Sequence, residues 1–268
     1  MRPAPGWYPD PWNTAGVRWW DGTSWTHHGA TRPILPRPPY ATLPLRAAVL
    51  MLCVLAASLT GNRLLLEGLS GLDLPVVVLV LVSVLVGYGP VLLFSVFVSR
   101  RWGTGSLHDD LGFRFRWVDA GWGPLTWLCC LVAQIAIGVV VYLTGIPSRS
   151  NTEGIDDLSG DRGVLLALLV TAVVAAPFVE ELAFRGVVLK GFASALPAWV
   201  AVGLQGVLFG AAHVGPERGA GNIGLVLVLA GVGIVLGGAA YLFRRLGPPI
   251  IAHGVLNAVA MAIVLLVR

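Results

Sequence analysis

Seven apolar segments fill the chain from residue 46 to its end, and they limit its fold more strongly than any other feature. All but the segment 197–213 reach or exceed the roughly 20 residues that a helix needs to cross the hydrocarbon core of a bilayer, and that segment falls just short. Backbone groups inside lipid must find hydrogen-bond partners within the segment, which favours helices. We therefore predict an all-α polytopic membrane protein with about seven transmembrane helices, at about 46–66, 74–98, 119–145, 163–192, 197–213, 222–243 and 249–267.

The composition supports this fold class. Hydrophobic residues make up 56% of the chain, charged residues make up only 12%, and the mean hydropathy is +0.79. A soluble globular domain carries about twice that share of charged residues. The composition therefore excludes a soluble domain, and it predicts that the lipid bilayer is the main partner of the chain.

The basic residues predict the orientation of the helices. If the N-terminus lies in the cytoplasm, where its polar, aromatic and proline-rich composition suggests that it stays, most of the arginines fall in inner segments. We interpret them as topology signals and expect no nucleic-acid partner. The expected location is the cell membrane. The inner residues are Arg2, Arg18, Arg32, Arg37, Arg46, Arg100, Arg101, Arg114, Arg116, Lys190, Arg244 and Arg245, and the outer ones are Arg63, Arg149, Arg162, Arg218 and Arg268.

The first 28 residues form a separate tryptophan-rich module. Asp21-Gly22 between two aromatic stretches predicts a small β-hairpin. The segment resembles a short N-terminal domain of unknown function that is common on actinobacterial membrane proteins. A module that packs on itself and one that recruits a protein partner both remain open. Residues 29–45 follow as a proline-rich, semi-rigid linker, so the transmembrane domain spans 46–268.

Charged residues interrupt the fourth apolar segment at Glu180, Glu181 and Arg185. A charge at membrane depth costs roughly 2.5 kcal/mol or more on insertion scales, so such residues need partners and usually a function. Glu181 and Arg185 are four residues apart, share a helix face and are expected to form an ion pair. Glu180 points about 100° away and has no nearby cation in the sequence, which suits a general base or acid.

Two later segments each carry one histidine. His213 lies on the same helix face as Phe209, and His253 lies on the same face as Asn257. A lone histidine in a membrane helix more often links two helices than catalyses a reaction. An imidazole and an amide one turn apart can nevertheless hold a developing oxyanion, which makes His253 and Asn257 candidates for that role.

The three motifs, Glu-Glu-x-x-x-Arg, Phe-x-x-x-His and His-x-x-x-Asn, are more specific together than any one alone. In this order on successive apolar segments they resemble the CPBP family. These are intramembrane proteases related to the CAAX prenyl endopeptidases and to bacteriocin-processing and self-immunity (Abi-type) proteins. The resemblance covers about residues 120–268 and implies an all-helical membrane fold whose motifs converge on a water-filled cavity.

The resemblance also implies roles for these residues. Glu180 and His213 would activate a water, and His253 and Asn257 would stabilise the tetrahedral oxyanion. Glu181 and Arg185 would keep the cavity in shape, with Phe209 as a further supporting residue.

Metal dependence stays open at this point. The family has also been described as zinc metalloproteases, in which case Glu180, His213 and His253 would be the ligands. The sequence has no His-Glu-x-x-His pairing, and we favour a mechanism that requires no cofactor, with Zn²⁺ as the alternative.

The predicted segment boundaries place the candidate residues at different depths. At about 1.5 Å per residue, Glu180 lies roughly 15 Å from the inner boundary, His253 roughly 7 Å and His213 roughly 24 Å. Groups that act together must come within hydrogen-bonding reach, so the helices must be tilted or broken, or the boundaries near Pro197 and Pro216 are misplaced.

The leading hypothesis is an intramembrane endopeptidase that uses a water activated by glutamate and histidine to cleave a membrane-associated protein or peptide. The alternative is a non-catalytic membrane interaction or immunity protein that recruits partners through its tryptophan-rich module. A proton-coupled transporter that uses Glu180 is a third reading, but no convincing internal repeat supports it.

Overall fold

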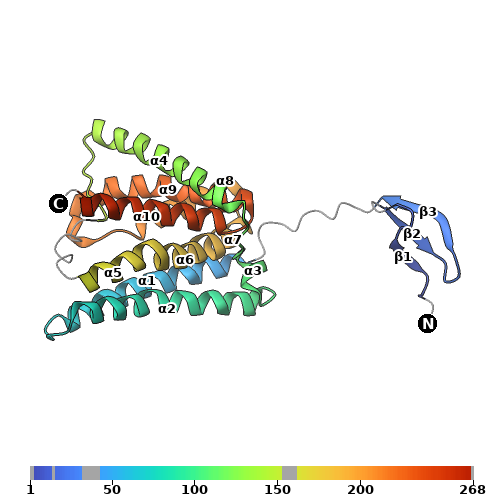
Figure 1. Ribbon diagram of the computed structural model, residues 1–268, viewed down its shortest axis with the longest axis horizontal. Coiled ribbons are helices and arrows are strands. Elements are labelled where there is room, and N and C mark those ends of the chain that lie inside the picture. The colour runs from blue at the N-terminus through green and yellow to red at the C-terminus, as the bar shows by residue number, and fades with distance from the viewer. Residues whose placement is uncertain (1–2, 14–15, 32–42, 153–161, 267–268) are drawn as a thin grey trace. The chain divides into compact units, whose positions relative to one another are not determined.

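The computed structural model describes residues 3–13, 16–31, 43–152 and 162–266. The chain divides into two compact units, Met1–Pro39 and Tyr40–Arg268, each of which is described by itself. Figure 1 shows a small sheet in the first unit and a bundle of helices in the second. Most of the predicted linker lies outside the described residues.

The first unit is a three-stranded antiparallel sheet in the order β1-β2-β3, formed by β1 (Gly6–Pro9), β2 (Gly16–Trp20) and β3 (Trp25–Thr31). The predicted hairpin is β2–β3. Its turn is held by the Asp21 carboxylate, which accepts hydrogen bonds from the amides of Thr23 and Ser24, both at 2.7 Å. Gly22 has a φ of +100°, which only glycine adopts without strain. The strand β1 pairs with β2 as the third strand of the sheet, and the hairpin pattern in the sequence did not predict it.

Indole contacts hold this sheet together in place of a closed core. The rings of Trp7 and Trp19 lie 5.6 Å apart and those of Trp20 and Trp25 lie 5.3 Å apart, both edge to face. Such pairs contribute about 0.5–1.5 kcal/mol beyond the area that they bury. A unit this small depends on them, because it buries too little apolar surface otherwise.

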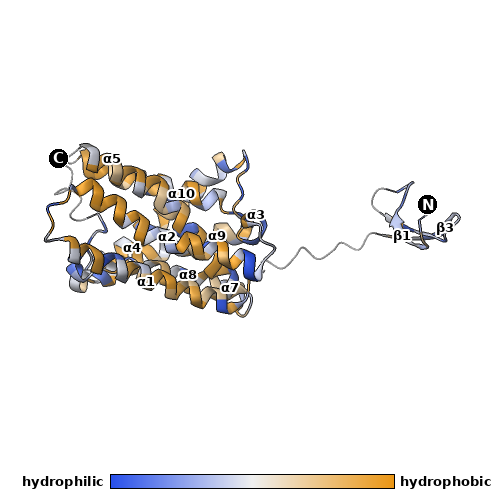
Figure 2. Ribbon diagram, turned by 90° about the horizontal axis from the view of Figure 1, so that it is seen from below, coloured by the Kyte–Doolittle hydropathy of each residue, from blue (hydrophilic) through white to orange (hydrophobic). Residues whose placement is uncertain are grey.

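Among the residues that the structure describes, the second unit contains six helices that are long and apolar enough to cross a membrane. The apolar residues cover the sides of the bundle and the hydrophilic residues gather toward its ends (Figure 2). The predicted fold class is therefore confirmed, and the fifth predicted segment, 197–213, is a shorter apolar helix, α8 (Ala198–Ala211). The six spans are α1 (Leu45–Leu69), α2 (Val76–Trp102), α4 (Asp119–Leu143), residues Gly163–Ala193, Pro216–Phe243, which includes α9 (Asn222–Phe243), and α10 (Gly247–Leu266).

The fourth span alternates between α-helix and the wider π-helix. It consists of α5 (Arg162–Val170), η2 (Thr171–Ala175), α6 (Ala176–Glu181), η3 (Leu182–Val188) and α7 (Leu189–Ala193). Pro177 cannot donate a backbone hydrogen bond, and its ring displaces the carbonyl four residues earlier. The π-helical turn just before it absorbs that mismatch, as π-helical turns often do near functional sites.

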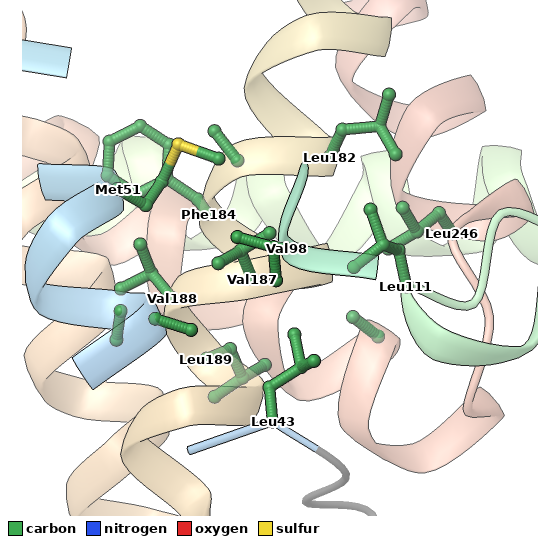
Figure 3. Packing of buried hydrophobic residues seen from close by; sticks show 14 of the residues in the cluster. Leu43, Met51, Val98, Leu111, Leu182, Phe184, Val187, Val188, Leu189 and Leu246 are labelled. Carbon is green, nitrogen blue, oxygen red and sulfur yellow. The ribbon is translucent and has the colours of Figure 1, made fainter. Parts of the chain in front are cut away.

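The largest core cluster packs the fourth span against α1, α2 and the inter-helix loops (Figure 3). Its centre is η3 and α7, whose residues Val187, Val188 and Leu189 are fully buried. Met51 of α1 and Val98 of α2 pack against them. This cluster fixes the span that carries the charged motif on the side of α1 and α2.

A buried turn joins α9 and α10. The amide of Leu246 donates to the Gly112 carbonyl at 2.8 Å, and Gly247 donates to the Arg114 carbonyl at 3.2 Å. Arg245 forms an ion pair with Asp119, which is 1% exposed. The first residues of α10 are therefore covered by the segment 111–119 and held by protein rather than by solvent.

The segment 111–119 is itself anchored by the short helix α3 (Leu107–Asp110). Burial alone would raise the pKa of the Asp110 carboxyl, but hydrogen bonds from the Ser99 hydroxyl and from the Thr104 and Gly105 amides outweigh it and lower the pKa. Lys190 in α7 donates to the Asp110 carbonyl at 2.6 Å. The loop between α2 and α4 is thus bonded to α2 through Ser99 and to α7 through Lys190.

Close approach of α8 and α9 requires glycine at position 206. A Cβ added there would lie 2.8 Å from the Ile234 nitrogen and 3.0 Å from the Ala230 carbonyl, both backbone atoms. We expect Gly206→Ala to destabilise the bundle by about 1–3 kcal/mol, because the backbones must move apart. Thermal unfolding of the purified protein in detergent measures this effect.

The matched control is Gly203→Ala on the same helix, where an added Cβ meets no atom within 4 Å. It should unfold at the wild-type temperature or slightly above, because alanine favours helix over glycine. Equal unfolding temperatures for the two variants would contradict the close packing of α8 on α9.

Candidate active site

Glu180 lies at the point where three helices meet. It occupies the last turn of α6, and its Oε2 lies 3.9 Å from the Nε2 of His213 and 3.9 Å from the Nε2 of His253. That oxygen is buried and accepts no hydrogen bond from any part of the chain that the structure describes. Glu180, which has no cation near it in the sequence, therefore faces the two histidines that were predicted as site residues.

His253 is oriented by the neighbouring glutamate. Its ring is 4% exposed, and its Nδ1 lies 3.0 Å from the Oε1 of Glu181. An ionised carboxylate only accepts hydrogen bonds, so the proton of the imidazole is assigned to Nδ1. The Nε2 atom is then directed toward Glu180.

His213 is oriented by a backbone carbonyl. It follows the C-terminal end of α8, where the last carbonyls of the helix lack intrahelical partners. Its Nδ1 lies 2.8 Å from the carbonyl oxygen of Phe209. Because a carbonyl also only accepts, Nδ1 is the donor, and Nε2 again faces Glu180.

The second glutamate and the arginine form the expected ion pair. Arg185 Nη1 donates to Glu181 Oε1 at 2.9 Å, and both side chains are completely buried. Arg185 Nη2 also donates to the Gly233 carbonyl of α9 at 3.0 Å. The pair therefore connects the fourth span to α9 and, through His253, to α10.

Gln205 belongs to this network and was not among the predicted site residues. Its Nε2 donates to the same Gly233 carbonyl at 2.8 Å, and the residue is fully buried. A lone amide in the middle of an apolar segment is the signal that could have identified it, since such a group needs a partner in lipid.

The ring of Phe209 lies at the centre of the site. It packs against His213 at 4.9 Å and His253 at 5.7 Å, measured between ring centroids. The Arg185 guanidinium lies over the ring, 4.4 Å from its centroid. Phe209 thus contacts the Arg185 guanidinium and both imidazole rings, and it helps to fix their positions.

Asn257 lies one turn after His253 on α10. Its Nδ2 donates to the Ala172 carbonyl of η2 at 2.8 Å, which leaves the second N–H of the amide for another acceptor. A cavity of about 230 Å³, which we call the polar cavity, is bordered by Glu180, His213, His253 and Asn257. All four predicted catalytic residues therefore line one space.

Counting residues from the predicted boundaries gave the wrong relative depths. From the turn that joins α7 (Leu189–Ala193) to α8, Glu180 and His213 are similar distances along their helices. His253 lies only six residues into α10, but α10 begins at the buried turn under the segment 111–119. Because α10 does not begin at the boundary that was counted from, His253 lies beside Glu180 and His213 although residue counting placed the three at different depths.

The donor types at the site suit zinc. Each histidine donates through Nδ1 to a carbonyl or carboxylate, as metal-bound histidines do. Among the residues that the structure describes, however, no group of three His, Cys, Asp or Glu side chains is spaced to hold a metal ion. We therefore derive no reaction step through a metal.

Comparison with known families agrees with the three motifs. Residues 162–259 match the family described as type II CAAX prenyl endopeptidase Rce1-like, and residues 5–40 match a protein family of unknown function, DUF2510. The first match includes all the motif residues and confirms the resemblance to the CPBP family. No curated protein and no solved structure matches the chain.

The two adjacent glutamates should differ in their effect on stability. Glu181→Gln removes the buried carboxylate that faces Arg185, and loss of one partner of a buried ion pair costs about 3–5 kcal/mol. Glu180→Gln should change the free energy of unfolding by about 1 kcal/mol or less, because Glu180 Oε2 accepts no hydrogen bond from the described residues. Thermal unfolding in detergent tests both, and equal destabilisation would contradict the division of roles.

Proposed function

We propose that this protein is an intramembrane endopeptidase that hydrolyses a peptide bond in a membrane-associated protein or peptide. The observation that carries the proposal is the convergence of Glu180 Oε2 and the Nε2 atoms of two histidines on one cavity, with both separations at 3.9 Å. The Rce1-like match over residues 162–259 supports the same class of reaction.

The facing atoms are suited to hold a water. With both protons on Nδ1, each Nε2 is an acceptor, and so is the Glu180 carboxylate. A separation of 3.9 Å is too long for a direct hydrogen bond. A water that bridges the Glu180 carboxylate and His213 Nε2, at about 2.8 Å from each, can donate to both. Water held in this way is polarised for attack on a carbonyl carbon.

In the proposed reaction His253 and Asn257 stabilise the oxyanion. His253 takes up a second proton from bulk water before the attack and keeps it through the reaction, so its Nε2 donates to the oxyanion and the Glu181 carboxylate at Nδ1 stabilises the imidazolium. Asn257 contributes its second N–H from the same cavity. Removal of a single oxyanion donor of this kind typically slows catalysis by about 10²–10³-fold.

The reaction balances with these groups alone. The water oxygen bonds to the scissile carbonyl carbon, and its proton passes to Glu180. The carbonyl oxygen carries the negative charge until the carbon–nitrogen bond breaks. The leaving amine then takes the proton from Glu180, which restores the carboxylate and releases two peptide fragments.

We further propose that the end of the bundle that carries α3 and the α9–α10 turn faces the cytoplasm. Arg100 and Arg101 end α2, and Arg244 and Arg245 lie in the turn. Loops rich in arginine are retained on the cytoplasmic side.

Substitution of the proposed base tests the function. Purified protein reconstituted in lipid vesicles should cleave membrane-associated peptides, and Glu180→Gln and His213→Ala should each reduce kcat/KM by about 10²–10⁴-fold. The matched control is Glu217→Gln, a glutamate that is 62% exposed, and it should retain wild-type activity. Equal cleavage by wild type and Glu180→Gln would rule out the proposal.

A chelator separates the metal-free reaction from the zinc alternative. Treatment with phenanthroline, followed by removal of the chelator, should leave the cleavage rate unchanged if no cofactor is required. Loss of activity that added Zn²⁺ restores would instead assign Glu180, His213 and His253 as zinc ligands. Metal analysis of the purified protein provides an independent reading of the same question.

A further inference from the structure

The segment 111–119, between α3 and α4, carries phenylalanines that alternate with arginines. Phe113 and Phe115 both pack on Phe178 of α6, each with ring centroids 5.9 Å apart. This contact attaches the segment to the fourth span. The two arginines of the segment, Arg114 and Arg116, take no part in it.

The guanidinium of Arg114 lacks an acceptor within the protein. Its Nε is buried and donates to no acceptor among the residues that the structure describes, while the side chain as a whole is only partly buried. Arg116 is exposed. Lys190 brings a further positive charge to the start of the segment through its hydrogen bond to the Asp110 carbonyl. The segment therefore offers positive charge that the described residues do not neutralise.

Positive charge dominates this whole end of the bundle, where hydrophilic residues gather around α3 and α7 (Figure 2). The acidic side chains are already engaged, because Asp110 accepts from the Ser99 hydroxyl, Asp119 pairs with Arg245, and Asp109 contacts His108. Among the described residues, the basic side chains at this end are Arg46, Arg100, Arg101, Arg114, Arg116, Lys190, Arg244 and Arg245, and the acidic ones are Asp109, Asp110 and Asp119. Such a surface attracts anions.

Trp117 indicates what covers the segment. Its side chain is 97% exposed, and its neighbours Phe115 and Val118 are about half exposed. The segment continues directly into α4, which is long and apolar enough to cross the membrane and carries the exposed Trp122 in its first turns. Indole rings favour the boundary between membrane and water. The segment 111–119 therefore lies at the level of the lipid headgroups, and lipid covers its apolar side chains.

An arginine at this level meets the phosphate groups of lipids. A guanidinium forms charge-assisted and often bidentate hydrogen bonds with phosphate. Each basic residue near an anionic membrane surface strengthens the attraction by a factor of about five. The indole of Trp117 beside the two arginines adds an apolar contact for the upper part of the lipid.

We propose that Arg114, Arg116 and Trp117 form a binding site for an anionic phospholipid, in which the two arginines hold the phosphate of the headgroup. We call it the headgroup site. It goes beyond the proposed endopeptidase function and does not depend on it, and it lies outside the three motifs.

The headgroup site adjoins the contacts that support α10. The Arg114 carbonyl accepts the hydrogen bond from the Gly247 amide, and the Arg116 amide donates to Asp119, the partner of Arg245. A lipid that holds both arginine side chains therefore restrains the backbone that supports the start of α10. Occupancy of the headgroup site should stabilise the bundle.

Thermal unfolding of the full-length protein in lipid nanodiscs tests this effect. With phosphatidylglycerol added to phosphatidylcholine, the wild type should unfold about 2–4 °C higher, because the lipid binds only the folded protein. The double variant Arg114→Gln/Arg116→Gln should lose most of this increase. The matched control, Arg100→Gln/Arg101→Gln at the end of α2, removes the same charge from the same end of the bundle and should keep it. Equal loss in both double variants would assign the effect to diffuse charge and overturn the proposal.

A binding measurement gives a reading that does not depend on stability. Native mass spectrometry of the purified protein should show phosphatidylglycerol retained by the wild type, with affinity lowered about fivefold by Arg114→Gln or Arg116→Gln alone. Trp117→Ala should also weaken retention. Equal affinities for phosphatidylglycerol and phosphatidylcholine would overturn the proposal. Inorganic phosphate that binds with the same dependence on Arg114 and Arg116, and displaces the lipid, would assign the site to a free anion and overturn it as well.

Discussion

The buried ion pair between Glu181 and Arg185 is the interaction on which the rest of the site depends. Both side chains are fully shielded from solvent and lipid, so neither charge is tolerable without the other. The pair also links the fourth span to two other helices. Glu181 accepts a hydrogen bond from the imidazole of His253 in α10, and Arg185 donates one to the Gly233 carbonyl of α9. Three helices are therefore set relative to one another by a single charged contact, and the orientation of His253 toward Glu180 follows from it.

Much of this arrangement could be predicted from local spacing. The four-residue separation of Glu181 and Arg185 predicts their contact, and the same reasoning isolates Glu180. The apolar segments predict the helical bundle, and Asp21-Gly22 predicts the turn between β2 and β3 in the N-terminal sheet. Each of these predictions needs only the periodicity of one element. They agree with the structure because the physics that determines them lies within a few neighbouring residues.

Features that depend on contacts between distant elements were not predictable in this way. The level at which α10 begins is set by hydrogen bonds from Leu246 and Gly247 to the loop at Gly112 and Arg114, more than 130 residues earlier in the chain. The π-helical turns in the fourth span and the buried amide of Gln205 depend on neighbours in the same manner.

The buried start of α10 affects how the site responds to its membrane. Helices that end at headgroups adjust to bilayer thickness by tilting, and their residues shift in depth with the lipid composition. The first turn of α10 is instead bonded to the loop after α3, which Asp110 and Lys190 fasten to α2 and α7. The position of His253 is therefore determined by contacts within the protein and not by the thickness of the bilayer. A mismatch between the bilayer thickness and the length of α1 or α4 changes the tilt of those helices. The distance between His253 and Glu180 does not change with it.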